Sequence, residues 1–252
     1  MKTLAIATVT VRETLNRKIQ VTLLIFAVLL VVATYVATLL TVGASHRMVA
    51  DLGLSGMELV SVLLATFLGA DLVAGDVQRR VIYPVVAKPV SRTQYLLGRY
   101  LGLSATLALN LLAMAVMLSA LFVYDARSFS PLSPTLAGAI ALLLLKVLTV
   151  AAIATLFSSF TNTTLASIFT LSLTIAGYLT SEVRSIWQGD HAWISALVWY
   201  ALPDLGTLTG NEAVVYRTAL PASAALGGLH ALAYAAAMLA LAAAVLERRD
   251  FR

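Results

Sequence analysis

The interval from Asp71 to Gly102, DLVAGDVQRRVIYPVVAKPVSRTQYLLGRYLG, is the one long polar stretch between strongly apolar segments of this chain. Its cations far outnumber its two acids, Asp71 and Asp76; they are Arg79, Arg80, Lys88, Arg92 and Arg99. A polar interval between two membrane spans lies in water at one face of the bilayer, and Lys and Arg near span ends are retained in the cytoplasm. The interval therefore predicts a membrane protein with a cytoplasmic loop at this place.

The composition supports the same class. Apolar residues make up 60% of the 252 residues and charged residues 12%, whereas a soluble domain carries about 25% charge. A chain of this length holds about six membrane helices with short connections, which leaves no room for a soluble catalytic domain. Cysteine is absent, which excludes disulfides and thiolate chemistry. We interpret the net charge of +5 as a charge that orients the chain in the membrane and attracts it to membrane lipid, and not as a sign of nucleic-acid binding.

Six apolar runs are long enough, or nearly so, to cross the hydrocarbon core, which takes about 20 residues. They are Val21 to Val42, Leu52 to Val73, Leu96 or Tyr100 to Val123, Leu136 to Phe157, Thr163 to Ser181, and Ala222 to Leu246. Small residues are dense in the last two runs, which favours close helix packing in lipid. The sequence predicts an all-α, polytopic protein with six transmembrane helices in one domain, residues 1–252.

Residues 1–19 precede the first run and predict a helix in the cytoplasmic interface. One helical face carries Leu4, Ala7, Thr8, Val11, Leu15 and Ile19, and Glu13 stands four residues before Arg17. The alternative is a strand-like segment in which polar and apolar residues alternate.

The distribution of cations gives the orientation. With both termini in the cytoplasm, twelve Lys and Arg residues lie inside and four lie outside, and Lys146 completes the seventeen. This bias satisfies the positive-inside rule. We expect a multi-pass protein of the inner, cytoplasmic membrane with both termini inside.

The order of residues in the opening interval resembles a known loop. It has Gly75-Asp76 at the end of a span, then Pro89-Val90-Ser91-Arg92, and then Tyr95-Leu96-Leu97-Gly98-Arg99. This is similar to the cytoplasmic loop of type-2 ATP-binding cassette (ABC-2) exporter permeases, and most similar to the branch of the nitrous-oxide-reductase copper-maturation transporter permease. The chain differs at Gln78-Arg79-Arg80-Val81, where those permeases usually have Glu or Arg and then Gly-Thr-Leu.

The resemblance implies a permease that forms a dimer with a second copy of itself and pairs with two copies of a cytoplasmic ATPase. The chain has no Gly-Lys-Ser or Gly-Lys-Thr phosphate loop, so it binds no cofactor itself, and ATP and Mg belong to the partner. The coupling loop is 74–95, with Ser91 as the N-cap of the next helix; its candidate contact residues are Arg79, Arg80, Lys88, Pro89, Ser91 and Arg92. Alternatively, these cations only anchor the loop to anionic lipid. The short connection 158–164 is a second, smaller contact.

All three tryptophans, Trp187, Trp193 and Trp199, lie in the interval 182–221. Tryptophan prefers the headgroup level, so this interval is expected at the outer interface. The family resemblance implies re-entrant helices here, and the alternative is a plain extracytoplasmic loop anchored by tryptophan.

Lys146 lies near the middle of the fourth run, where a cation is costly. It has three possible roles: a residue of a wet pathway, a buried partner of a carboxylate, or a side chain that extends to the interface. Asp71 and Asp76 form a candidate cytoplasmic gate if they pair with Arg79 or Arg99; otherwise they are simply solvated. The histidines are scattered and the methionines are typical of apolar spans, so no metal site is predicted.

Two other functions compete with transport. An ATPase can use a membrane anchor of this kind to act mechanically on an envelope or periplasmic protein. Gly53-Leu54-Ser55-Gly56, with His230 as a base, also has the form of an intramembrane serine protease motif. We expect the chain not to be an enzyme.

Overall fold

The computed structural model describes residues 2–16, 45–79, 91–125, 134–186, 202–216 and 218–248, and five single positions between residues 17 and 44. Every regular element in these ranges is a helix, as predicted. The helices are α1 (Lys2–Leu15), α3 (Ser45–Gln78), α5 (Arg92–Asp125), α6 (Pro134–Phe160), α7 (Thr163–Ile186), α9 (Asn211–Val215) and α10 (Ala222–Arg248).

Five of the described helices are long and apolar enough to cross a membrane. They are Ala50–Gln78 of α3, Arg92–Ala120 of α5, all of α6, Thr163–Thr180 of α7, and Ser223–Arg248 of α10. They correspond to five of the six predicted spans and make the chain a multi-pass membrane protein. The predicted first span lies outside the described residues except at five helical, exposed positions, Val21, Ile25, Val28, Val32 and Val36.

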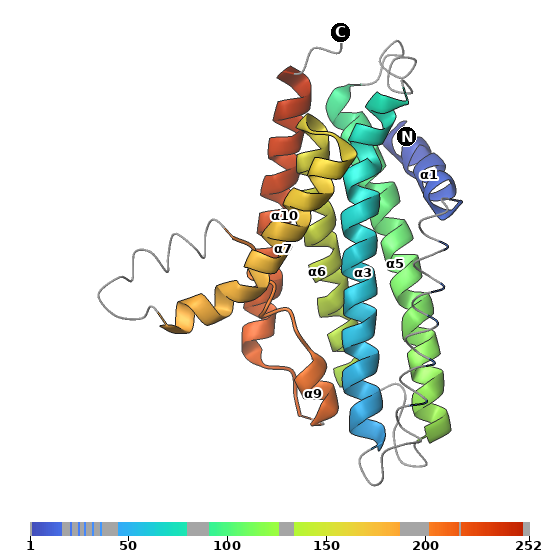
Figure 1. Cartoon of the computed structure of the whole chain (residues 1–252), viewed down its shortest axis with the longest axis vertical. Coiled ribbons are helices and arrows are strands. Elements are labelled where there is room, and N and C mark those ends of the chain that lie inside the picture. The colour runs from blue at the N-terminus through green and yellow to red at the C-terminus, as the bar shows by residue number, and fades with distance from the viewer. Residues whose placement is uncertain are drawn as a thin grey trace.

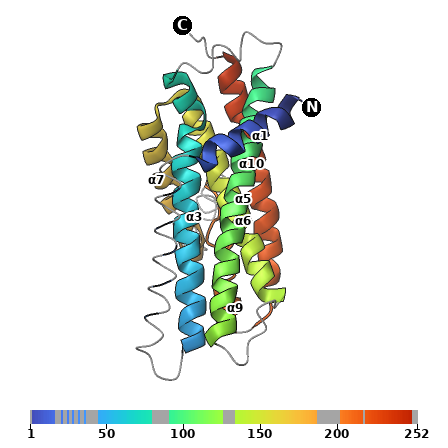
Figure 2. The ribbon, with the colours of Figure 1, turned by 90° about the vertical axis from the view of Figure 1, so that its right-hand side faces the viewer.

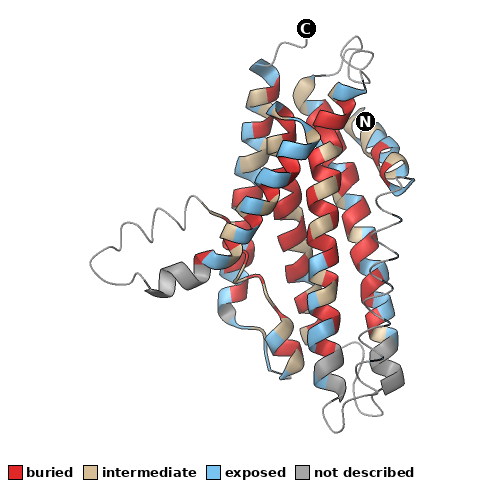
Figure 3. Cartoon of the chain, viewed as in Figure 1, coloured by how far each residue is buried: buried red, intermediate tan, exposed pale blue. Residues whose placement is uncertain are grey.

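The long helices lie side by side along the long axis of the molecule (Figure 1). Both chain termini lie at one end, called here the upper end as in Figure 1, together with the ends of α3, α5 and α6 that face residues 80–90 and 161–162. The lower end carries α9. Helices α3 and α6 are the most buried (Figure 3).

The α3–α6 interface is closely packed because small residues meet across it. A Cβ atom placed on Gly69 of α3 would lie 2.6 Å from the Cβ of Ala154 on α6, so a side chain there would force the helices apart. Ser158 adds polar contacts: its hydroxyl donates to the Ala70 carbonyl (2.7 Å) and accepts from the amides of Val73 (3.0 Å) and Ala74 (2.9 Å). These contacts make α3 and α6 the central pair of the bundle.

Helix α7 buries its small and polar face. Ser167, Thr170, Thr174 and Gly177 are buried, and each of the three hydroxyl residues lies three or four positions from the next. Its large apolar residues point outward; they are Leu165, Ile168, Phe169, Ile175 and Leu179. This pattern is expected where lipid, and not water, surrounds the bundle.

Helix α1 lies across the upper part of α5 (Figure 2). A Cβ atom on Gly102 would lie 2.7 Å from the Ala7 carbonyl oxygen, and one on Gly98 would lie 3.0 Å from the Thr3 carbonyl oxygen. The two glycines, four residues apart, therefore admit the α1 backbone at close range. The helical alternative predicted for residues 1–19 is confirmed over Lys2–Leu15, and Leu4 of the predicted apolar face is 66% exposed, on the outer side of α1.

Replacing Gly102 by leucine should therefore release α1 from α5. We expect the amide hydrogens of Lys2–Leu15 to exchange about tenfold faster or more in lipid nanodiscs, because the docked helix is lost while the spans remain. Ala105→Leu is the matched control, since residue 105 is exposed on the same helix. Unchanged exchange in Gly102→Leu would mean that the close approach does not hold α1 in place.

Part of the interval 182–221 returns to the bundle. The Leu205 amide donates to the Gly177 carbonyl of α7 (3.2 Å), and Pro203, Asp204 and Leu205 are buried. Irregular backbone is tolerated within a membrane protein where protein covers it. Helix α9 then contacts the lower part of α3. Trp187, Trp193 and Trp199 lie outside the described residues, so the predicted interfacial role of the tryptophans is not tested.

Candidate functional site

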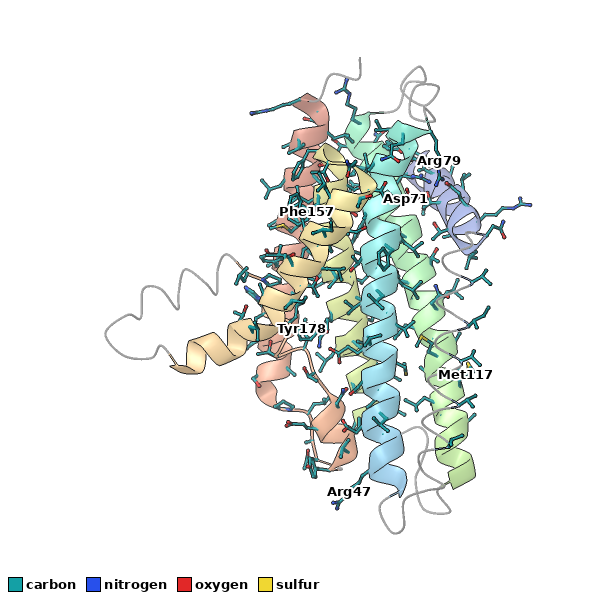
Figure 4. The ribbon with its side chains drawn as sticks, in the orientation of Figure 1. Arg47, Asp71, Arg79, Met117, Phe157 and Tyr178 are labelled. Atoms are coloured by element: carbon teal, nitrogen blue, oxygen red, sulfur yellow. The ribbon has the colours of Figure 1, made fainter. Side chains whose placement is uncertain are left out.

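Six charged or phenolic side chains meet at the upper end. We call this group the upper cluster; its members are Glu13 of α1, Asp71 and Asp76 of α3, Arg79 in the turn directly after α3, and Tyr95 and Arg99 of α5. Figure 4 shows Asp71 and Arg79 beside α1 at this end, far from Arg47 at the opposite end. The cluster joins the two helices that flank residues 80–90.

Arg99 is the centre of the upper cluster. Its guanidinium is almost fully buried and binds both Asp76 and Glu13, the latter at 2.7 Å. The Tyr95 hydroxyl donates to the other oxygen of Asp76, so both carboxylate oxygens are engaged. Asp76 is thus paired with Arg99, one of the two partners considered from the sequence, and is not simply solvated.

Asp71 is bound more weakly. Arg79 lies 3.3 Å from one Asp71 oxygen, and the Thr163 hydroxyl donates to the other (3.4 Å). Arg79 also lies 4.0 Å from Glu13, but its side chain is 56% exposed. An exposed pair contributes little to stability, so Asp71 and Arg79 can exchange partners more easily than Asp76 and Arg99 can.

The start of α5 is tied to the end of α10. Ser91 caps α5 as predicted, since its hydroxyl accepts from the Gln94 amide (3.2 Å). Arg92 donates to the carbonyls of Leu246 (3.0 Å) and Glu247 (3.1 Å), which are among the last of α10 and lack partners within the helix. Arg92 therefore has a structural role that the sequence did not predict.

The remaining predicted coupling residues cannot be placed. Arg80, Lys88 and Pro89 lie outside the described residues. The predicted loop 74–95 is helical at both margins, because α3 continues to Gln78 and α5 begins at Arg92.

A second group, the inner triad, consists of Lys146, Glu58 and Tyr178. The Lys146 ammonium lies 2.6 Å from Glu58 Oε1, and the Tyr178 hydroxyl donates to the same oxygen at 2.6 Å. The ammonium also lies 4.8 Å from the centre of the Tyr178 ring, within the range of a cation–π contact. The triad connects α6, α3 and α7 in the middle of the bundle.

Burial separates the members of the inner triad. The Lys146 side chain is 0% exposed and that of Glu58 is 15% exposed. Of the three roles considered for Lys146, the structure shows pairing with a carboxylate, and a side chain that is 0% exposed does not extend to the interface. A role in a wet pathway stays a prediction. Glu58 was visible in the sequence as an acid inside the second run, but its partner was not.

The geometry does not favour the alternative chemistries. Among the described residues, no group of three or more His, Cys, Asp or Glu side chains could hold a metal ion. Ser55 accepts a hydrogen bond from Asn211 of α9 (3.3 Å), and the His230 ring lies beside Tyr234, with ring centres 6.3 Å apart. Within the described part of the chain, the hydrogen bond found at Ser55 therefore comes from an amide, which cannot serve as the base of a serine nucleophile.

The sequence missed Glu13 and Tyr95 as members of the upper cluster. The sequence predicts a local pair of Glu13 with Arg17, which lies outside the described residues, and the structure shows a contact of Glu13 with Arg99 of another helix. Tyr95 and Arg99 are four residues apart and share a helix face, which was the available signal for Tyr95.

A scan against protein-family models gives no match, and a search of curated proteins gives none either.

Proposed function

We propose that the chain is the transmembrane permease subunit of an ATP-binding cassette exporter of the ABC-2 type. In this proposal it has six spans, a re-entrant outer segment and cytoplasmic termini, lies in the inner membrane, and forms the translocation path with a second copy of itself. Two copies of a separate ATPase supply the energy, because this chain has no phosphate loop.

One observation carries the proposal: the helices that flank the basic interval 80–90 are locked together at their upper ends. Asp76 at the end of α3 binds Arg99 of α5, and both groups are buried. A force applied to residues 80–90 would therefore move α3 and α5 as a pair. This is the behaviour required of a membrane subunit that receives motion from a cytoplasmic partner.

The same end distributes that motion to the other helices. Glu13 ties α1 to Arg99, Arg92 ties α5 to α10, and Thr163 ties α7 to Asp71. The concentration of interhelical ion pairs beside residues 80–90 thus supports a coupling role over simple lipid anchoring.

A purification experiment tests the proposal. The tagged chain, extracted from its native membranes in mild detergent, should retain a cytoplasmic ATPase. The double charge reversal Arg80→Glu/Lys88→Glu should lower the retained ATPase about tenfold or more, at unchanged yield of the chain. Arg92 is unsuitable for this test because it also binds α10. Arg12→Glu, which reverses an exposed cation of α1, is the matched control.

If no ATPase is retained by the unmodified chain, the proposal fails. If one is retained, reconstituted vesicles distinguish the two mechanisms. ATP-dependent accumulation of a solute supports export. ATPase activity that responds only to an envelope protein supports the mechanical anchor. The lower end offers a surface for such a partner at α9 and the residue after it, Tyr216, whose ring centre lies 5.8 Å from the Arg47 guanidinium.

A further inference from the structure

Helix α7 is bound to α3 at two separate levels. At the upper end the Thr163 hydroxyl donates to Asp71 (3.4 Å), and lower down the Tyr178 hydroxyl donates to Glu58 (2.6 Å). Figure 4 shows Tyr178 well below Asp71. The two contacts are 15 residues apart on α7, or about 22 Å along the helix.

The interface just above the lower contact is incompletely satisfied. Ser61 is one turn from Glu58, and Thr174 is one turn from Tyr178 on the antiparallel helix. Both hydroxyl oxygens are buried and have no hydrogen-bond partner within the described part of the chain. Buried polar groups are normally paired, so the two unpaired hydroxyls destabilise the contact between α3 and α7 at that level.

The neighbouring interfaces are different. Helix α6 is fixed to α3 by the three hydrogen bonds of Ser158 and by the close approach at Gly69. Helix α7 is joined to α6 by a tight turn in which Asn162 accepts from the Leu165 amide (2.9 Å) and caps α7. One end of α7 is therefore fixed. Further down, among the described residues, the Tyr178 hydroxyl gives α7 a side-chain hydrogen bond to Glu58 of α3, and Gly177 packs against residues 203–205.

We infer that α7 is a gate helix that pivots at the turn 161–162, with the Tyr178–Glu58 hydrogen bond as its latch. This inference rests on the proposed function, because it places the opening of the translocation path between α3 and α7. When the latch opens, Glu58 keeps Lys146 as its partner, so no charge is left unpaired. Water entering the open interface would satisfy Ser61 and Thr174.

Lys146 is a positioning residue in this device. Its ammonium holds Glu58 Oε1 at the place that the Tyr178 hydroxyl reaches, and its charge lies against the Tyr178 ring. Residues 203–205 would move with α7, since the Leu205 amide is bound to the Gly177 carbonyl.

Spin labels on the full chain in nanodiscs test the latch without a partner protein. The chain has no native cysteine, so labels can be placed at Leu59→Cys and Leu179→Cys, which are exposed beside the latch, and at Gln78→Cys and Leu165→Cys, which are exposed near the pivot. Tyr178→Phe removes only the latch hydroxyl. We expect it to add a population at the latch pair that is longer by about 5 Å or more, with the pivot pair unchanged.

Tyr216→Phe, which removes an exposed hydroxyl elsewhere, is the matched control and should alter neither distance. If Tyr178→Phe is not monodisperse, the double variant Glu58→Leu/Lys146→Met removes the acceptor without leaving one buried charge, and it should lengthen the latch distance in the same way. Unchanged latch distances in the variant tested would overturn the inference. Loss of ATPase retention in the purification experiment would instead count against the proposed function and leave the latch result standing.

Discussion

Lys146→Met is expected to destabilise the chain by about 3–5 kcal/mol. The substitution keeps the approximate length and volume of the side chain but leaves Glu58 in the bundle with only the Tyr178 hydroxyl. Removing one partner of a buried pair has this magnitude because the remaining charge is uncompensated. Denaturation of the purified chain in SDS, followed by circular dichroism, measures the effect.

The double variant Lys146→Met/Glu58→Gln separates the ion pair from packing. Glutamine is neutral and still offers an oxygen to the Tyr178 hydroxyl, so we expect most of the lost stability to return. Replacing a whole buried pair by neutral residues is often close to neutral. If the double variant is as unstable as Lys146→Met, the lysine contributes through packing and not through its charge.

Much of the fold follows from sequence patterns of the kind that lipid imposes. The apolar runs identified five described spans within a few residues of their observed ends, because each span must be long enough to cross the hydrocarbon core. Ser91 was recognised as a helix cap from its type and position. These features are local, so one sequence contains them.

The spans were predicted too short where polar groups are buried by protein. The sequence predicts Asp76 within the coupling loop 74–95, either paired with Arg79 or Arg99 or simply solvated. In the structure α3 continues to Gln78, and Arg99 and Tyr95 bind that carboxylate. Hydropathy counts an acid as a span end whether or not a partner is present. The difference arises from tertiary pairing, which a single helix does not encode.

The dependence on tertiary contacts also explains why the sequence predicted the inner triad only in part. Lys146 was evident as a costly intramembrane cation, yet its partner lies 88 residues away in the chain. To identify Glu58, and not another acid, as the partner of Lys146, one must know how α3 and α6 are rotated about their axes. That rotation is set by close approaches such as Gly69 against Ala154, and these are visible only when two helices are packed.

Arg92 shows how a correct position can have a different partner. It lies on the expected side of the bundle at the first turn of α5, and its charge suggested contact with an ATPase. Its guanidinium binds the last carbonyls of α10, where the negative end of the helix dipole also favours a cation; the contact of Arg92 with an ATPase stays a prediction. Positive charge near a span end thus serves helix capping, a role separate from the orientation predicted from the sequence.

Arg99→Met is expected to disrupt the upper cluster and to cost about 3–5 kcal/mol as well, since it leaves Asp76 buried without its cation. Its structural effect should differ from that of Lys146→Met. Glu13 loses its 2.7 Å contact, so the amides of α1 should exchange faster, whereas Lys146→Met should leave α1 docked. Hydrogen–deuterium exchange of both variants in nanodiscs makes the comparison.

Two further variants identify what Arg99 supplies. Arg99→Met/Asp76→Asn removes both charges of the pair and should restore much of the stability but not the docking of α1, because the contact between Glu13 and Arg99 is still lost. Arg99→Lys keeps the charge, but a lysine ammonium cannot reproduce the planar fork that reaches Asp76 and Glu13 together, so an intermediate loss is expected. If lysine restores both stability and α1 protection in full, then charge alone holds α1, α3 and α5 together.

Under the proposed function, the Asp76–Arg99 link would carry motion between the helices, so a variant that is stable but lacks it should retain the ATPase while transport falls. Transport at the unmodified level in such a variant would move the coupling route to the contacts of α7 and α10.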